Sequence, residues 1–308
     1  MTSAGKVVIT SANCATAGFL IPRLREKGYH TTGLIRQPAA IGTDAIITDW
    51  MNSDAAKTAL AGADYIIHLS GDANAANSRL YKEANYDTTR RVADSARNGK
   101  VRRIIYISYS NAGTHQKNLY LHYKGHAENL LLSTGKEVVI FRCPVIIDAP
   151  GRPSRIDPLF VSQKGKAVPA IGSGQQKMHP VYRGDVVNAI LSALEKGHPG
   201  RYELSGPEEM TVDEFIHIVN DNPATPAGRD HARQAGQKLP VRIRHIPGWL
   251  AILLSRLVPG LSPTFVDLML HHTDSLYSPA TYGEFGLAPC SIIGLFSQPG
   301  NLNNVENQ

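Results

Sequence analysis

Short, continuous apolar runs alternate with longer amphipathic stretches along the first half of the chain. Apolar runs without polar alternation are typical of parallel strands that are covered on both faces. The pattern predicts strands over residues 6–10, 30–35, 45–48, 64–70, 102–108 and 138–141. It predicts helices between them, over residues 17–27, 53–61, 76–98 and 120–133. A strand followed each time by a helix predicts the α/β class and a doubly wound parallel sheet, whose ligand crevice lies beyond the carboxyl ends of the strands.

The pattern changes after Phe141, where polar loops rich in glycine and proline separate shorter elements. We therefore predict a first domain over residues 1–149 and a smaller, partly helical lobe over residues 150–308. Residues 179–205 are expected to return to the first domain. Because the lobe lies after the sheet in the chain and could close over its carboxyl edge, we expect it to set substrate specificity.

Within the lobe, Thr211 and Glu214 stand at capping-box spacing and predict the start of a helix. The polar stretch 221–238 contains proline and glycine and predicts a mobile surface loop. The apolar segment 246–260 is too short to span a bilayer and is interrupted by Arg256. It most simply covers the core of the lobe; a partner interface is the second interpretation and a membrane surface the third.

Composition favours a protein that handles small anionic ligands. The 308 residues carry a net charge of +6, but the basic residues are scattered rather than gathered with aromatics, which argues against nucleic acid. Cys14, Cys143 and Cys290 lie far apart without a CxxC pair, so we expect neither a disulfide framework nor a metal site. The first residues lack the apolar stretch of a signal peptide, and we expect a cytoplasmic protein that does not bind membranes.

The segment KVVITSANCATAGFL, residues 6–20, has the pattern of a strand, a tight turn and a helix start. Such a turn binds a pyrophosphate and normally carries three glycines, which here are replaced by Ser11, Cys14 and Ala17. A Cβ at the first two positions opposes the approach of phosphate and is strained where φ is positive. The N–H groups and dipole of the helix N-terminus still attract phosphate. The residues predicted to surround the cofactor here are Ser11, Asn13, Cys14, Ala15, Thr16 and Ala17.

Arg36 follows the second predicted strand, where the adenosine ribose of a dinucleotide would lie. A carboxylate at this point is typical of NAD binders, whereas an arginine suits the 2′-phosphate of NADP. No Asp or Glu occurs between Thr31 and Ala40. We therefore predict NADP(H) as the cofactor, with NAD(H) as an alternative and no cofactor at all if the glycine-poor turn has lost binding.

Three residues after the fifth predicted strand suggest proton chemistry. Ser110 stands at the end of that strand, and Tyr120 and Lys124 are four residues apart on one face of the next predicted helix. An ammonium near a phenol stabilises the phenolate and lowers the pKa of the tyrosine, which makes it a proton donor or acceptor near neutral pH. A serine hydroxyl at the carboxyl edge of the sheet could hydrogen-bond a carbonyl oxygen.

These motifs, in this order, resemble the short-chain dehydrogenase/reductase superfamily with its Rossmann domain. The resemblance is to the extended or atypical branch, which holds the NAD(P)-dependent epimerase/dehydratase and NmrA-like proteins, and it covers nearly the whole chain. Asn85 and Asp185 stand where this family has a helix asparagine and a later aspartate. The resemblance implies further cofactor contacts by Asp49 and Trp50 in TDW, by Leu69, Ser70 and Gly71 in HLSG, and by Pro144 and Val145 in FRCPVIID.

The resemblance also implies roles and an activity. Tyr120 would be the general acid/base, Lys124 would lower its pKa and hold the nicotinamide ribose, and Ser110 would orient the substrate oxygen. The implied activity is that of an NADP(H)-dependent reductase or dehydrogenase of a small carbonyl or alcohol, because the interval from Ser110 to Tyr120 is short for a nucleotide-sugar epimerase. The alternative is a non-redox protein: an NmrA-like regulatory or accessory binder, or an isomerase, dehydratase or cyclase without hydride transfer. The expected partner is a small-molecule substrate, and a homodimer stays open.

Overall fold

The computed structural model describes residues 4–150, 157–162, 166–221, 241–258, 260–271 and 276–297. Its contacts divide the chain into two units. The first comprises residues 1–143, 186–203 and 279–287, and the second comprises residues 144–185, 204–278 and 288–308. The predicted surface loop falls almost entirely on residues 222–240, outside the described part, as does the polar C-terminal tail.

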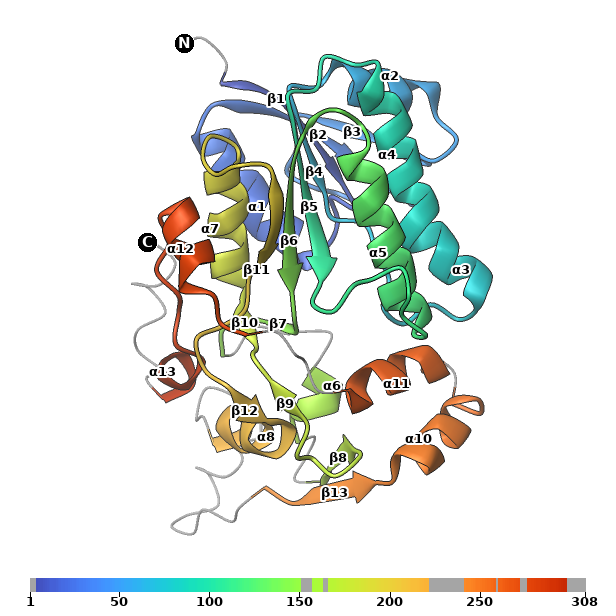
Figure 1. The fold of residues 1–308 in the computed structure, drawn as a ribbon, viewed down its shortest axis with the longest axis vertical. Helices are drawn as coiled ribbons and strands as arrows, with labels where there is room; N and C mark the ends of the chain where they lie inside the picture. Colours follow the sequence, from blue (N-terminus) through green and yellow to red (C-terminus); the bar gives the residue numbers. More distant parts are fainter. Residues whose placement is uncertain are drawn as a thin grey trace. The chain divides into compact units, whose positions relative to one another are not determined.

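The first unit is built on a seven-stranded, all-parallel sheet with the order β11-β6-β5-β4-β1-β2-β3 (Figure 1). The strands are β1 Gly5–Thr10, β2 Tyr29–Leu34, β3 Ala45–Ile47, β4 Tyr65–His68, β5 Arg103–Tyr109, β6 Glu137–Cys143 and β11 Gly200–Glu203. The chain passes from β3 at one edge back to β4 beside β1, which makes the β1–β4 boundary the point where the winding reverses. This arrangement confirms the predicted doubly wound fold, and in such folds ligands generally bind at the carboxyl ends of the strands beside the reversal, which here are β1 and β4.

Helices cover both faces of this sheet, with α2, α4 and α5 on one face and α1 and α7 on the other (Figure 1). The helices are α1 Ala15–Glu26, α2 Asp54–Gly62, α3 Ser78–Lys82, α4 Thr88–Arg97, α5 Leu119–Leu132, α7 Arg183–Ala193 and α12 Pro279–Phe285. The helix predicted over 76–98 is continuous but contains a π-helical turn, η1, at Glu83–Asp87. Such turns are often found at functional sites.

The first unit ends at Cys143, where β6 ends, rather than at residue 149. It also includes residues 279–287, which no sequence pattern placed there. The reason is aromatic packing, because Phe285 of α12 lies edge-on to Phe141 and Tyr202, with ring centroids 4.9 Å apart in both pairs. Large rings at this spacing bury apolar area and favour this relative orientation.

A buried chain of hydrogen bonds joins the carboxyl ends of β1 and β4. The Thr10 hydroxyl accepts from the backbone N–H of Leu69 (3.0 Å) and Ser70 (3.3 Å), so its own proton is donated to Nδ1 of His68, 2.8 Å away. Burial lowers the pKa of His68 to about 3, so the ring is neutral and its Nε2–H donates to the Thr89 hydroxyl at 2.9 Å. A buried neutral network in which each donor has an acceptor rigidifies the crevice edge.

The second unit has a core of its own, in which Phe160, Val168, Met178, Phe215 and Ile292 pack together. In its described part, strands pair two by two as β10-β7, β12-β9 and β13-β8. The strands are β7 Ile146–Ile147, β8 Val168–Ile171, β9 Lys177–Met178, β10 Val181–Tyr182, β12 Met210–Thr211 and β13 Ile243–Ile246. The helices are α6 Asp157–Phe160, α8 Val212–Asp221, α10 Gly248–Ser255, α11 Pro263–Leu270 and α13 Ile292–Ser297.

The predicted capping box is present at the start of α8. Glu214 accepts from the backbone N–H of Thr211 at 2.7 Å, and the Thr211 hydroxyl accepts from the N–H of Glu214 at 3.2 Å. Among the helices of the described residues, none is long and apolar enough to cross a membrane.

The position of α5 depends on a close backbone contact that only glycine allows. A Cβ added to Gly125 would lie 2.7 Å from the amide nitrogen of Gly113, in the loop between β5 and α5. Gly125→Ala should therefore lower the free energy of unfolding by about 1–3 kcal/mol, because helix and loop must separate. Gly18→Ala in α1 is the control, since nothing lies within 4 Å of the added Cβ, and it should leave stability unchanged or raise it by up to about 1 kcal/mol. Chemical denaturation measures both variants; equal stabilities would contradict this packing.

Candidate functional site

In the turn between β1 and α1, only one of the residues that stand in place of the usual glycines has a strained backbone conformation. Ser11 has φ +50°, in the left-handed region, whereas Cys14 has φ −80° and is the N-cap of α1. The Cys14 sulfur accepts from the backbone N–H of Ala17 at 3.4 Å. The Ser11 hydroxyl is 2.9 Å from the hydroxyl of Ser70, which ties this turn to the loop after β4. The glycine positions are therefore filled by residues that make specific contacts, and the helix N-terminus is preserved.

The other residues of this turn divide into two groups. Asn13 and Ala15 are exposed at the mouth of the turn, while Thr16 and Ala17 are buried. The exposed pair lies at the N-terminus of α1, the end of a helix that attracts phosphate, although the Ala17 N–H is already donated to the Cys14 sulfur. The buried pair instead packs the helix closely against the sheet, which is the function of the third glycine in the usual motif.

Arg36 and Asp49 lie next to each other where the adenosine of the cofactor is predicted to bind. The Asp49 N–H donates to the Arg36 carbonyl at 3.3 Å, because β2 and β3 pair in parallel just before them. Arg36 is exposed, and its guanidinium has no ion-pair partner among the described residues. The Asp49 carboxylate accepts from the Asn52 amide at 3.0 and 3.2 Å. The indole of Trp50 is 1% exposed and packs in the core, so only its backbone could reach a ligand, and this contact stays a prediction.

The loop after β4 is fastened by Asn85, which lies in the π-helical turn. Its side chain accepts from the N–H of Asp72 (3.0 Å) and donates to the carbonyls of Asp72 (3.0 Å) and Tyr81 (2.9 Å). A Cβ at Gly71 would lie 2.9 Å from the Lys124 nitrogen and 3.0 Å from the Asn85 oxygen. A side chain at position 71 would therefore force Lys124 or Asn85 to shift. Leu69 is partly exposed and Gly71 exposed, whereas Ser70 is buried.

Tyr120 and Lys124 lie on the same buried face of α5, as predicted. The helix begins there because the Asn118 side chain caps it, accepting from the N–H of Tyr120 at 3.1 Å. The Lys124 nitrogen donates to the carbonyls of Ile107 (2.9 Å) and Ser70 (3.4 Å) and lies 5.8 Å from the centroid of the Tyr120 ring. No hydrogen bond to the Tyr120 hydroxyl occurs within the described part of the chain.

The pKa of Tyr120 is shifted in the direction opposite to the one expected. Burial raises the pKa of its phenol well above the ordinary value, with further contributions from Tyr109 and Tyr106. Burial also lowers the pKa of Lys124 to about 7. The prediction that Lys124 makes Tyr120 acidic is therefore wrong for the protein without ligands: desolvation opposes the phenolate and the ammonium alike, so each group favours its neutral form.

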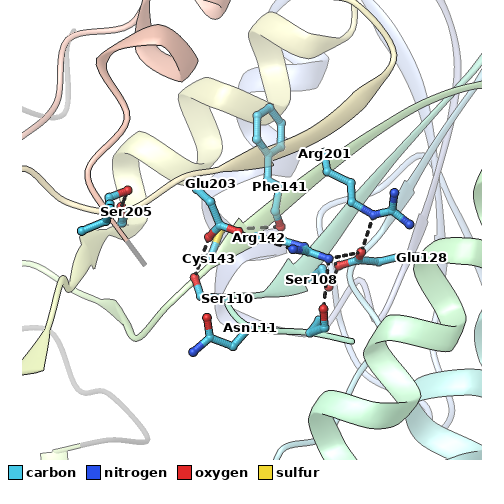
Figure 2. Close-up of polar contacts among 12 residues, drawn as sticks. Ser108, Ser110, Asn111, Glu128, Phe141, Arg142, Cys143, Arg201, Glu203 and Ser205 are labelled. Atoms are coloured by element: carbon cyan, nitrogen blue, oxygen red, sulfur yellow. Dashed lines mark hydrogen bonds and ion pairs between the residues drawn. The ribbon is translucent and has the colours of Figure 1, made fainter. Parts of the chain in front are cut away.

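Ser110 is fully buried and donates its hydroxyl proton to Glu203 at 3.1 Å (Figure 2). The resemblance implied that Ser110 orients a substrate oxygen. In this structure its proton is directed at Glu203 instead. Sequence reasoning missed Glu203 because it follows Ser110 by 93 residues. Only the sheet order, which sets β11 beside β6 and β6 beside β5, brings the carboxylate to the serine.

Behind Ser110, Glu128 of α5 is 1% exposed and binds two arginines (Figure 2). It accepts from Arg142 at 2.7 Å, from Arg201 at 2.7 Å and from the Ser108 hydroxyl at 2.6 Å. Arg142 also lies 3.6 Å from Glu203. Two carboxylates and two guanidiniums balance in charge, and they fix α5 to β6 and β11. Burial raises the pKa of Glu203, while the Ser110 hydrogen bond and Arg142 oppose that rise.

Three residues implied by the resemblance belong to the second unit. Pro144 is buried, and Val145 packs against the core of that unit. Asp185 accepts from the backbone N–H of Cys290 at 2.8 Å, and burial raises its pKa to about 6. The nicotinamide contacts of Pro144 and Val145 stay a prediction.

The histidines near α5 form no metal site. The ring centroids of His122 and His126 are 4.5 Å apart. Burial lowers the pKa of His126, and the nearby His122 lowers it further. Within the residues that the structure describes, no group of three or more His, Cys, Asp or Glu side chains could hold a metal ion.

Comparison with known proteins places this fold in a family. The model of the NAD dependent epimerase/dehydratase family matches residues 8–205. Subunit 9 of the 1 alpha subcomplex of mitochondrial NADH dehydrogenase (ubiquinone) from Arabidopsis thaliana is 30% identical over 177 residues, which are 56% of this chain and 44% of that protein. Its counterpart from Dictyostelium discoideum is 25% identical over 219 residues, 66% of this chain and 58% of that protein. The chain thus matches about half of the length of these relatives.

Solved structures show the same fold along nearly the whole chain. MoeE5 in complex with UDP-glucuronic acid and NAD has a TM-score of 0.69 and 18% identity, covering 96% of this chain and 97% of that one. UDP-glucuronic acid 4-epimerase from Bacillus cereus, in complex with UDP-glucuronic acid and NAD, has a TM-score of 0.69 and 16% identity, covering 95% and 96%.

Proposed function

The chain belongs to the NAD-dependent epimerase/dehydratase family, and from that premise we propose that it binds NADP(H) and catalyses the reversible reduction of a small carbonyl compound. The observation that carries the proposal is the Tyr120 hydroxyl, which has no hydrogen bond among the described residues, beside the buried amine of Lys124. A polar group of this kind at the carboxyl edge of the sheet suits a reacting oxygen.

The residues present fit NADP(H). The N-terminus of α1, with the exposed Asn13 and Ala15, offers N–H groups to a pyrophosphate. Arg36 is exposed and free of carboxylates within ion-pair distance among the described residues, so its guanidinium suits a 2′-phosphate. The strain at Ser11 is partly offset by its hydrogen bond to Ser70. NAD(H) is the alternative cofactor.

In the proposed reaction the cofactor supplies the hydride, and the side chains of α5 handle the proton. Tyr120 donates its proton to the oxygen of the carbonyl as that oxygen gains negative charge. A raised pKa keeps Tyr120 protonated before the reaction. Protonated Lys124 then stabilises the phenolate that is left, and its pKa of about 7 means that both its forms are populated at neutral pH. The reverse reaction uses the same groups in the opposite order.

A second candidate function is cofactor binding without hydride transfer. The observation that favours it is Ser110, whose proton is committed to Glu203 and whose side chain is fully buried. Without this donor, the carbonyl oxygen would have Tyr120 as its proton source but lack a second hydrogen bond. The curated relatives that carry a functional name are subunits of an NADH dehydrogenase, which fits an accessory role. Turnover, rather than binding, separates the two candidates.

The choice of cofactor is tested by Arg36→Ala. Loss of a charged hydrogen bond to a 2′-phosphate should weaken NADPH binding about 10- to 100-fold and change NADH binding less than about threefold. Titration followed by nicotinamide fluorescence measures both. Arg79→Ala, at an arginine exposed on α3, is the control and should change neither. Equal losses for NADPH and NADH would remove Arg36 from this role.

The chemistry is tested by Tyr120→Phe. We expect turnover of NADPH with a panel of small aldehydes and ketones to fall about 10²- to 10⁴-fold, because the proton donor is lost. NADPH affinity and thermal stability should stay near those of the parent protein, since the hydroxyl has no hydrogen bond in the described structure. Tyr123→Phe, three residues on and partly exposed, is the matched control. If the parent protein binds NADPH but reduces none of the panel, the accessory function is favoured instead.

A further inference from the structure

The helix α10 and the turn after it expose large apolar side chains. Trp249 is 70% exposed, Leu253 49% and Leu257 76%, and they are spaced four residues apart. Trp249 and Leu253 therefore lie on one face of α10 (Gly248–Ser255), and Leu257 follows in the turn after the helix. Leu254 and Val258 are also exposed and lie next to this stripe. We refer to these five residues as the α10 surface.

The helix packs on its own unit through its smallest side chains. Within α10 the buried residues are Ala251 and Ser255, and the Ser255 hydroxyl donates to the carbonyl of Ile252. The helix packs beside α11, where a Cβ at Gly248 would touch Leu270 (Figure 1). The expectation that this apolar segment covers the core of the lobe is therefore wrong for the five residues of the α10 surface, whereas Leu250 and Ile252 are partly buried. Exposed clusters of this kind mark an interaction surface.

Along the chain, the charged residues nearest the α10 surface are basic, while Asp267 of α11, the helix that packs beside α10, is partly exposed. Arg242 and Arg244 precede the helix and Arg256 follows it, and all three are exposed. None of them has an ion-pair partner among the described residues. From residue 241 to residue 266 the described chain holds no Asp or Glu, the next being Asp267 in α11. A protein partner would more often meet a rim of both signs, whereas exposed arginines that flank an apolar helix with exposed tryptophan and leucine side chains suit contact with an anionic membrane.

We propose that the α10 surface binds the surface of a bilayer that contains anionic phospholipids. The helix lies in the plane of the membrane, with Trp249, Leu253 and Leu257 at the boundary between headgroups and acyl chains. The three arginines contact lipid phosphates. Contact from the surface is the mode that fits, because no described helix is long enough to cross. This inference does not depend on the proposed enzymatic function.

The two tryptophans make a direct measurement with the full-length chain feasible. Trp50 is 1% exposed and Trp249 70% exposed, so a change in emission on binding reports on Trp249. Vesicles of phosphatidylcholine with about one third phosphatidylglycerol should shift the emission to the blue and carry the protein to the top of a flotation gradient. Pure phosphatidylcholine vesicles should bind at least about tenfold more weakly, and high salt should weaken binding to the anionic vesicles.

A pair of matched variants locates the contact. Leu253→Ser should reduce the fraction bound to anionic vesicles about tenfold. Ile293→Ser on α13, at a residue of nearly equal exposure (48% against 49%), should leave binding unchanged. Both positions are exposed, so circular dichroism should show both variants folded. Arg256→Gln tests the charge contribution and should reduce the salt dependence.

Three outcomes would overturn the proposal. One is the absence of flotation with anionic vesicles. Another is binding that Leu253→Ser and Ile293→Ser reduce equally, which would indicate non-specific adhesion. The third is a dimer, seen by light scattering, that Leu253→Ser dissociates while no protein floats; the α10 surface would then be an interface between two copies of the chain.

Discussion

The arrangement of the first unit depends on one buried amine. Lys124 lies beneath the carboxyl edge of the sheet, where its nitrogen donates to carbonyls at the ends of β4 and β5. That position depends on the small size of Gly71, because a Cβ there would lie 2.9 Å from the amine and force it to shift. It also requires α5 to approach its preceding loop as closely as Gly125 and Gly113 allow. Without these constraints, neither Lys124 nor Tyr120 would reach the edge where a cofactor and substrate could meet.

Desolvation is the dominant electrostatic effect at this edge. A buried amine favours its neutral form, and a buried phenol does so as well. Burial therefore disfavours the charged forms of both Lys124 and Tyr120. A ligand that brings negative charge or hydrogen-bond acceptors would change this balance in favour of the ammonium. The acidity of the tyrosine is therefore expected to depend on what is bound, which links binding to chemistry.

The ion-pair network beside this site has one buried member, Glu128, and three partly exposed ones. Glu128 and Glu203 are matched by Arg142 and Arg201, with hydrogen bonds to most of their oxygens. An ion pair on a buried carboxylate contributes less to stability than to geometry, because desolvation offsets much of the attraction. Here these ion pairs hold one end of α5 against β6 and β11. The same network occupies the proton of Ser110, and this is the feature that most separates the site from a simple reductase.

The features that could be predicted from the sequence are those that local sequence patterns determine. All six expected strands form, since short runs rich in apolar and β-branched residues mark them, and Tyr120 and Lys124 share a face because helix geometry requires it. The sequence did not predict Glu203, which reaches Ser110 only through the order of the sheet. Nor did it predict the burial of Trp50, or the direction of the Tyr120 pKa, because both depend on how deeply packing places a side chain. The spacing of residues along the chain does not show how deeply a side chain is buried.

The desolvation of Lys124 is measured most directly by an NMR titration of its side chain in the protein without ligands, with Lys124→Met used for assignment. Burial between two carbonyls predicts a midpoint near pH 7, far below the ordinary value of 10.5. A midpoint close to 10.5 would mean that the amine is in contact with water. In that case the desolvated site described above does not exist.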